Sequence, residues 1–309
     1  MHKVILFRLL QLPLIMAIIY VLTFLLAWVA PGDPFAGEGK NMDPVVKEML
    51  QKRFHADNAW QFLGYYPLRV LTRGDFGWSM QYREWSVNDI IRSALPVSIT
   101  LGLFALVLAL FVGVGVGTLA SVRRGGVLDW ASLSISLVGI SLPSFVIAAA
   151  LLVAAAASRS MPVGGWGRAS DLVLPGLALS LAPMAYIARL TRVAMLDVLG
   201  ADYVRTARAK GLSRPVVIWK HCLRNAFLPV LSYLGPAAAV TLTGSFVVET
   251  VFNIPGLGKH FVNSVLNRDR TLILGVVMVY SLFLLAFNLL VDIAYAWVDP
   301  RIDLAGKGH

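Results

Sequence analysis

Long apolar stretches separated by polar loops dominate the chain. The hydrocarbon core of a bilayer needs about 20 predominantly apolar residues per helix, and six stretches meet this requirement: 9–30, 95–121, 129–157, 172–195, 228–250 and 272–298. Pro143 interrupts the third stretch, and Pro175 and Pro183 interrupt the fourth, which membrane helices tolerate when they pack in a bundle. The pattern predicts an all-α integral membrane protein with six transmembrane helices.

The first apolar stretch resembles a secretory signal because His2, Lys3 and Arg8 precede it. Its apolar run is longer than the roughly 7–15 residues of a signal core, and Trp28 would occupy the third position before a cleavage after Ala30. We therefore expect a retained helix.

The composition agrees with a membrane protein. Hydrophobic residues make up 58% of the chain and charged residues 14%, whereas soluble domains carry roughly 25% charged residues. A net charge of +10 would suggest nucleic acid as a partner of a soluble protein. In a membrane protein Lys and Arg first indicate topology, so we predict a lipid bilayer and no nucleic acid as partner.

The basic residues are distributed unevenly between the predicted loops. With the N-terminus inside, the inner segments hold 14 Lys and Arg, and the two short outer loops hold five. By the positive-inside rule, this asymmetry predicts that both termini are inside.

The long first loop, about residues 31–94, is balanced in charge and weighs little in that rule. Asp43 followed by Pro44 is typical of a helix start, with Val46 and Leu50 on one face, and it predicts a short amphipathic helix on the outer surface. The chain then divides into residues 1–94 (first helix plus outer loop), 95–298 (a five-helix core) and 299–309 (a cytoplasmic tail).

The sequence lacks the motifs of several kinds of catalytic and cofactor-binding site. The Gly-Lys pairs at Lys40, Lys259 and Lys307 lack both the upstream Gly and the following hydroxyl of an ATP-binding Walker A loop. All five His fall in loops or at ends, and the single Cys222 excludes a disulfide framework or a cysteine metal site. We expect no enzyme activity, no metal site and no cofactor on this chain.

Polar and small residues within the spans allow two interpretations each. Gly113 and Gly117 are spaced for close helix approach. Glu249 could contact a substrate or lie at the membrane interface. The hydroxyl residues Thr241, Thr243 and Ser245 of the same span could line a translocation path, or could serve helix packing.

The most informative stretch is the basic segment, residues 200–229, between the fourth and fifth spans. Asp202 is a candidate N-cap for a helix over 203–210, and Gly211 suits a left-handed helix end. Ser213 and Pro215 then begin a second helix. A short basic helix with small residues at Ala207 and Gly211 suits docking into a protein groove, or else anchoring at lipid headgroups.

The basic segment resembles the EAA loop of ABC-importer permeases, in the variant form of the dipeptide/oligopeptide family. When Gly211 is aligned with the motif Gly, Ala207 falls on the second Ala, and Arg205 and Thr206 replace the Glu and first Ala. In that family the loop couples the membrane domain to the ATPase. The residues that the resemblance assigns to this coupling are Asp202, Tyr203, Arg205, Thr206, Ala207, Arg208, Ala209, Lys210, Gly211, Leu212, His221 and Arg224.

Other segments resemble the same family in order along nearly the whole chain. They are Arg8–Gln11, Pro31–Pro34, Arg73–Gly77, Ala188–Arg192, Glu249–Phe252 with Pro255–Gly258, Asn288–Asp292 and Asp299–Arg301.

The resemblance implies the type I ABC-importer architecture, in a bacterial cytoplasmic (inner) membrane. The chain would form half of a peptide translocation pathway as a heterodimer with a homologous permease. Two cytoplasmic ATPases would bind ATP and Mg, and an extracytoplasmic binding protein would deliver the substrate. The alternatives are a related permease for nickel, glutathione or another small solute, a secondary transporter, and a structural membrane anchor.

Overall fold

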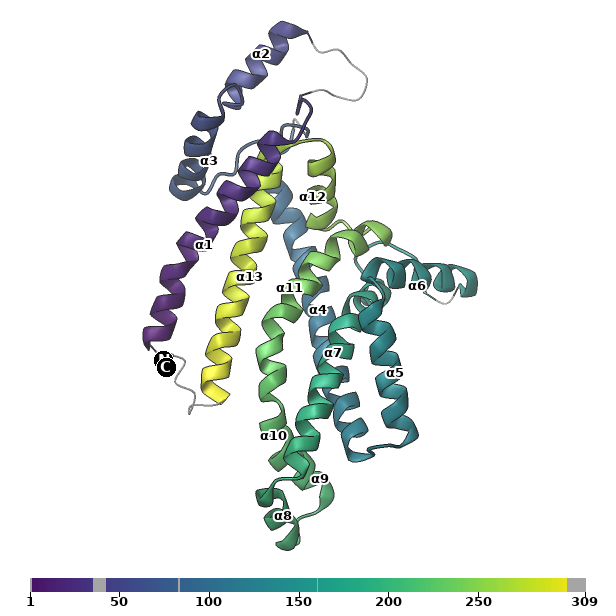
Figure 1. Ribbon diagram of the computed structural model, residues 1–309. Helices are drawn as coiled ribbons and strands as arrows, with labels where there is room; N and C mark the ends of the chain where they lie inside the picture. Colours follow the sequence, from purple (N-terminus) through teal and green to yellow (C-terminus); the bar gives the residue numbers. More distant parts are fainter. Residues whose placement is uncertain (1, 36–42, 83, 160, 299–309) are drawn as a thin grey trace. The chain divides into compact units, whose positions relative to one another are not determined.

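The computed structural model describes residues 2–35, 43–82, 84–159 and 161–298 (Figure 1). The predicted tail 299–309 lies outside these ranges. The described residues form helices and no strand, apart from one isolated bridge between Trp78 and Ser86. The helices are α1 (His2–Val29), α2 (Pro44–Arg53), α3 (Ala59–Arg73), α4 (Val87–Val122), α5 (Val127–Ser141), α6 (Ser144–Ser158), the 3₁₀ turn η1 (Ala169–Leu172), α7 (Val173–Leu199), α8 (Asp202–Ala209), α9 (Arg214–Val216), the π-helical η2 (Val217–Cys222), α10 (Leu223–Ala226), α11 (Leu228–Val251), α12 (Leu257–Leu266) and α13 (Arg270–Val298).

Five helical stretches of the described chain are long and apolar enough to cross a bilayer. They are Arg8–Val29, Val87–Val122, Ala169–Leu199, Leu228–Val251 and Arg270–Tyr295. Each one covers a span predicted from the sequence. The helix of the second span begins eight residues before the predicted limit, at Val87, and it continues through Pro96.

The third predicted span, 129–157, is not one continuous helix. It consists of α5 and α6, which are bent by 107° relative to each other. The break lies at Leu142, which is extended, and at Pro143. Because proline disfavours the α conformation of the preceding residue, Leu142 leaves the helix. The bilayer-crossing total is six only if this bent pair makes one span.

The chain divides into two compact units, with boundaries inside α1, α4 and α13 and between α11 and α12. Of the described residues, one unit contains those within 2–5, 99–254 and 286–298, and the other contains those within 6–98 and 255–285. Within the first unit α7 packs against α5, α6 and α11, and Figure 1 shows α5 running beside α7.

Glycines bring α4 close to α7, as the sequence predicted for Gly113 and Gly117. A Cβ atom at Gly113 would lie 2.8 Å from the Met184 carbonyl oxygen, and one at Gly117 would lie 2.4 Å from the Ala188 carbonyl oxygen. Both separations are too short for any side chain. Gly115, on another face of α4, has open space. The spacing of four therefore marks a packing face.

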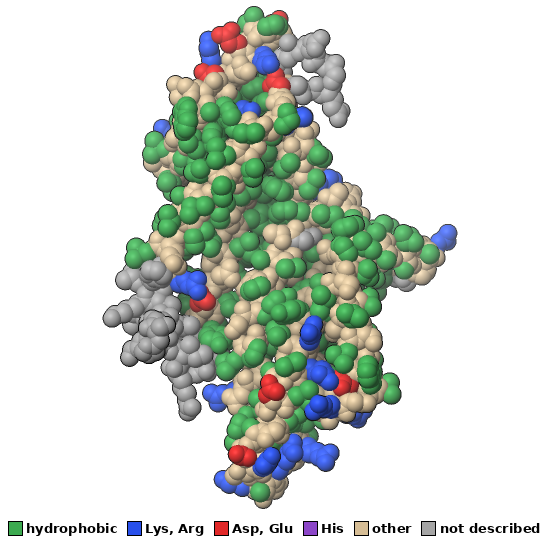
Figure 2. All heavy atoms as spheres, viewed as in Figure 1, with side chains coloured by type: hydrophobic (Ala, Val, Ile, Leu, Met, Phe, Trp, Pro, Cys, Tyr) green, Lys and Arg blue, Asp and Glu red, His purple; other side chains and the backbone are tan. Residues whose placement is uncertain are grey.

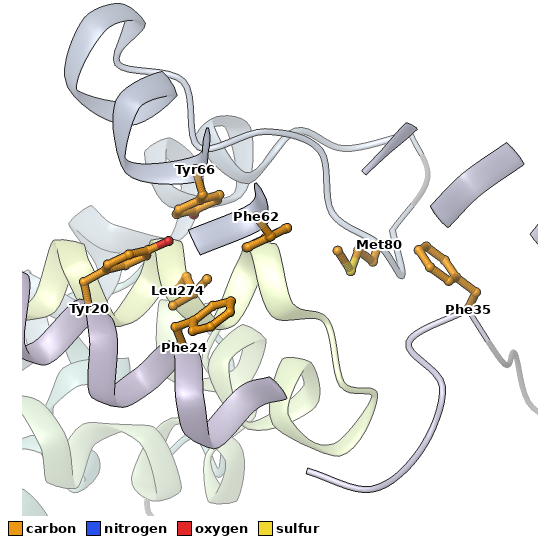
Figure 3. Close-up of a cluster of buried hydrophobic side chains, with 7 residues drawn as sticks. All are labelled: Tyr20, Phe24, Phe35, Phe62, Tyr66, Met80 and Leu274. Carbon is orange, nitrogen blue, oxygen red and sulfur yellow. The ribbon is translucent and has the colours of Figure 1, made fainter. Parts of the chain in front are cut away.

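An aromatic cluster forms the core of the second unit (Figure 3). Tyr20 of α1 stacks on Tyr66 of α3 with ring centroids 6.1 Å apart, and Phe62 stacks on Tyr66 at 5.5 Å. The Tyr20 hydroxyl donates to the Leu63 carbonyl oxygen (2.9 Å), and the Tyr66 hydroxyl donates to the Thr271 carbonyl oxygen (3.0 Å). The hydroxyl group of each of these two tyrosines thus has a hydrogen-bond partner. The two bonds and the stacked rings fix α3 to both α1 and α13.

The predicted short helix after Asp43 is confirmed as α2, and the Asp43 carboxylate accepts the Val45 N–H at 2.9 Å. Neither α3 nor α12 was predicted from the sequence. A signal for α3 was present, since Asn58 caps its start and Gly74, with φ of 62°, ends it. Both residue types are typical of these positions.

Candidate functional site

The basic segment folds into three short helices and a π-helical turn, from α8 to α10. Helix α8 ends where Gly211 adopts a φ of +79°, and the N–H groups of Gly211 and Leu212 donate back to the carbonyl oxygens of Arg208 and Ala207. This left-handed ending confirms the predicted role of Gly211 as the helix stop.

The predicted N-cap of this helix was wrong by one residue. Ala201 occupies the N-cap position, without a side-chain hydrogen bond, and Asp202 is the first helical residue. The Asp202 carbonyl oxygen accepts the Thr206 hydroxyl (3.0 Å), and its carboxylate lies 3.5 Å from Arg205. A carboxylate in the first turn still complements the positive end of the helix dipole. Ser213 takes the predicted N-cap position of α9, but it too makes no side-chain cap bond.

One face of α8 is buried against its own neighbours. Val204 and Ala207 pack in a hydrophobic cluster with Met195 of α7, Val217 and Cys222 of η2, and Ala226 of α10. The spacing of three places Val204 and Ala207 on the same side of the helix. Ala207 is therefore not a small surface residue open to a partner, contrary to the sequence-based interpretation, and only Gly211 of the two small residues lies exposed.

The other face of α8 is exposed and basic. Figure 2 shows Lys and Arg side chains gathered over α8 and α9. The exposed predicted coupling residues are Asp202, Tyr203, Arg205, Thr206, Arg208, Ala209, Lys210, Gly211 and Leu212. The structure thus brings the predicted residues together on one short helix and its end.

A hydrogen bond between side chains fixes α8 to α10. Asn225 Nδ2 donates to the Tyr203 hydroxyl at 2.8 Å. Of the predicted residues farther along the chain, His221 is half-buried in η2 and Arg224 is exposed on α10. Burial raises the pKa of the Cys222 thiol between them, and Cys222 acts as apolar filling in the cluster under α8. The hydrogen bond and the buried cluster therefore hold α8 in a fixed position relative to η2 and α10, with its other face exposed.

Two features of this region were not predicted from the sequence. Residues Val217–Cys222 form a π-helical turn, and such turns are frequent at functional positions of helices. A hollow of about 290 Å³ opens beside α8, with Arg208 and Arg214 on its wall together with Val122 and Leu199. Its two guanidinium groups suit a negatively charged group.

The predicted path residues of α11 have different exposures. Thr241, Ser245 and Glu249 are buried, whereas Thr243 is exposed. The three hydroxyl groups donate to carbonyl oxygens one turn earlier in α11, with Ser245 bonded to Leu242 at 2.6 Å. Thr243 alone of these residues presents its side of α11 outward from this chain.

Within the described residues, no group of three or more His, Cys, Asp or Glu side chains is arranged to hold a metal ion.

Comparisons with known proteins identify the family. Residues 112–304 match the model of the binding-protein-dependent transport system inner membrane component family. The chain is 44% identical to the dipeptide transport system permease protein DppB of Bacillus subtilis over 94% of both chains. It is 42% and 40% identical to the oligopeptide transport system permease proteins OppB of Haemophilus influenzae and Escherichia coli, over 98% of this chain and 99% of theirs.

A resemblance inferred from the basic segment and its companion motifs is thus confirmed along nearly the whole length. The relatives are permease subunits and not enzymes, and the family is one of inner membrane components. The chain belongs to the binding-protein-dependent transport system inner membrane component family, as a multi-pass permease subunit of the dipeptide/oligopeptide type in a bacterial inner membrane.

Proposed function

We propose that this chain forms half of the pathway for imported dipeptides or oligopeptides and couples it to ATP hydrolysis through the exposed face of α8. The observation that carries the proposal is the pairing of a buried face, Val204 and Ala207, with an exposed basic face that ends at Gly211. Because one face of α8 is packed against α7, η2 and α10, a displacement of α8 by a partner bound to its other face is transmitted to these helices. The printed names of the relatives, dipeptide and oligopeptide permeases, support the peptide cargo.

The partners follow from the family. A substrate-binding protein delivers the cargo, and two ATPases bind ATP and Mg at the cytoplasmic face, since none of the three Gly-Lys pairs of this chain fits a Walker A loop. A homologous second permease completes the pathway as a heterodimer. ATP-driven closure of the ATPases moves α8 and biases the pathway between inward-facing and outward-facing states.

We propose that both termini and the basic segment lie inside, that residues 31–94 lie outside, and that residues 95–298 form the core, as in type I ABC importers. The uneven distribution of Lys and Arg supports this orientation. The orientation is tested with two variants of a Cys222→Ser chain, Gly211→Cys and Gly74→Cys. Each is treated with a membrane-impermeant maleimide. We expect labelling of intact spheroplasts only at position 74. Labelling at position 211 and not at position 74 would show the opposite orientation.

The substrate test uses proteoliposomes that contain this permease, its partner permease and both ATPases, with the binding protein added outside. We expect ATP-dependent uptake of radiolabelled dialanine. Other short peptides should inhibit this uptake by competition, whereas Ni²⁺ and glutathione should not. Uptake of Ni²⁺ or glutathione in place of peptides would favour the related small-solute permease. Uptake driven by a proton gradient without ATP would favour a secondary transporter.

The path assignment rests on α11. We propose that Thr243, whose side of α11 faces outward from this chain, contacts the cargo, and that the buried Thr241, Ser245 and Glu249 hold α11 in position. In the same proteoliposomes, Thr243→Val should change the apparent KM for peptide more than the ATPase rate.

A further inference from the structure

A buried ion pair joins α5 to α7 in the unit that carries α8. Arg192 Nε lies 2.5 Å from Asp129 Oδ1, and Arg192 Nη2 lies 2.8 Å from Asp129 Oδ2. The Gly125 N–H donates to the same carboxylate at 2.9 Å. The Asp129 side chain is 4% exposed and that of Arg192 18%. A bidentate pair of this kind fixes both the distance and the orientation of its partners.

The pair connects α5 to α7, which α6 and η1 separate in the sequence. Asp129 lies in the first turn of α5, directly after the turn that follows α4. Arg192 lies seven residues before the end of α7 at Leu199, which corresponds to about two helical turns. Helix α8 begins three residues after Leu199. The pair therefore stands between the α4–α5 hairpin and the helix that leads into α8.

Apolar packing already places this hairpin along α7 over a longer stretch. Gly113 and Gly117 bring α4 against α7, and a Cβ atom at Gly139 of α5 would lie 3.2 Å from the Ala185 Cβ of α7. Such contacts allow helices to slide, because they are not directional. The charged pair, next to the turn between α4 and α5, is directional, and loss of Arg192 would leave the buried Asp129 carboxylate without its cationic partner.

We propose that Asp129 and Arg192 are positioning residues that make the α4–α5 hairpin and α7 move as one body when α8 is displaced. Without the pair, a displacement of α8 moves α7 but is only partly transmitted to α4 and α5. ATP is then hydrolysed with less substrate moved. This inference rests on the proposed coupling through α8.

The test compares Asp129→Asn, Arg192→Gln and the double variant in proteoliposomes with the partner permease, the ATPases and the binding protein. The quantity measured is dialanine transported per ATP hydrolysed. We expect each single variant to lower this ratio about tenfold, within the range of couplings between distant sites, with ATPase association unchanged. The double variant should be no worse than either single one, because residues that act as a pair are not additive.

The control is Lys52→Gln, which removes an exposed ion pair with Glu48 and should leave the ratio unchanged.

If the variants lower only the amount of assembled complex, and the remainder transports with the wild-type ratio, the pair has a merely structural role and the inference is overturned. If Gly211→Trp leaves ATPase association intact, the proposed coupling itself fails. If Gly211→Trp abolishes association but the Asp129 variant keeps the wild-type ratio, only this inference fails.

A second measurement does not depend on turnover. Spin labels at Arg124→Cys in the hairpin turn and Val193→Cys on the exposed side of α7, in a Cys222→Ser chain, report the distance between the two elements. We expect one distance that is the same with and without ATP in the assembled complex, and a broadened or shifted distribution in Asp129→Asn. A distance that changes with ATP in the otherwise unaltered chain would show that the hairpin and α7 move separately.

Discussion

The carboxylate of Asp269 accepts a hydrogen bond from the Ser79 hydroxyl, although 190 residues separate them. The same carboxylate accepts the Leu272 N–H at 3.1 Å and the Thr271 hydroxyl at 2.9 Å, at the start of α13. The Ser79 oxygen in turn accepts the Tyr82 N–H at 2.7 Å. One fully buried side chain thus caps a membrane helix and fixes a turn of the long first loop to it.

Replacement of Asp269 by Ala should destabilise this unit strongly. Several buried donors would lose their acceptor, at a cost of about 1–3 kcal/mol for each group left unsatisfied. Ser79→Ala should cost about 1 kcal/mol. The measurement is thermal unfolding of the purified chain in detergent. The exposed helix cap Asp43 provides the control, since Asp43→Ala should lower the melting temperature least, and an equal loss in Asp269→Ala and Asp43→Ala would contradict the interpretation.

Leucine at Gly113 should prevent correct packing of α4 on α7, whereas leucine at Gly115 should be tolerated. The former side chain would meet the Met184 carbonyl oxygen and Ile187, and the latter would enter open space on the same helix. Overpacking of a close contact typically costs about 1–3 kcal/mol or more. Monodisperse yield after detergent extraction compares the two variants. Equal yields would show that α4 and α7 do not pack through this face.

Acid should loosen the turn after α3, where Arg69 lies 2.5 Å from Asp75. Burial raises the pKa of Asp75, but hydrogen bonds from Arg69 and the Gly77 N–H, with the charge of Arg69, outweigh it and hold the pKa below 3.8. Because the folded pKa is the lower one, the stabilisation is present above the unfolded pKa and is lost as pH falls through the folded pKa.

Hydrogen exchange at the Gly77 N–H, which donates to Asp75 at 2.8 Å, reports this loss. After correction for the intrinsic exchange rate, protection should fall below about pH 4 in the natural chain. In Asp75→Asn it should be weaker at neutral pH and should change little with acid. Protection that does not change with pH in the natural chain would exclude the carboxylate as the cause.

Features that depend on local chemistry were predictable from the sequence. Apolar length identified the bilayer-crossing helices, Asp43 identified the start of α2, and Gly211 identified the end of α8. The spacing of Gly113 and Gly117 identified a packing face. In each case the signal lies within a few residues and a single physical cause dominates.

Features that depend on tertiary packing were not predictable in the same way. Pro143 marked an interruption, but no local pattern gives the 107° angle between α5 and α6, which both pack on α7. The pairing of Asp129 with Arg192 joins residues 63 positions apart. Ala207 seemed suited to a surface because it is small, yet its side faces Met195 and Val217. Each outcome is decided by neighbours that a local pattern does not contain.

Tryptophan at Gly211 tests whether the exposed end of α8 docks on an ATPase. A side chain there meets nothing within 4 Å in this chain, and the same holds for Gly74 at the end of α3, which also has a positive φ. The two substitutions therefore introduce similar backbone strain, and only one lies on the proposed docking surface. We predict that Gly211→Trp inserts into the membrane normally but loses co-purification with the ATPases and peptide uptake, while Gly74→Trp retains both. Normal co-purification and uptake with Gly211→Trp would show that this end of α8 does not dock on the ATPases.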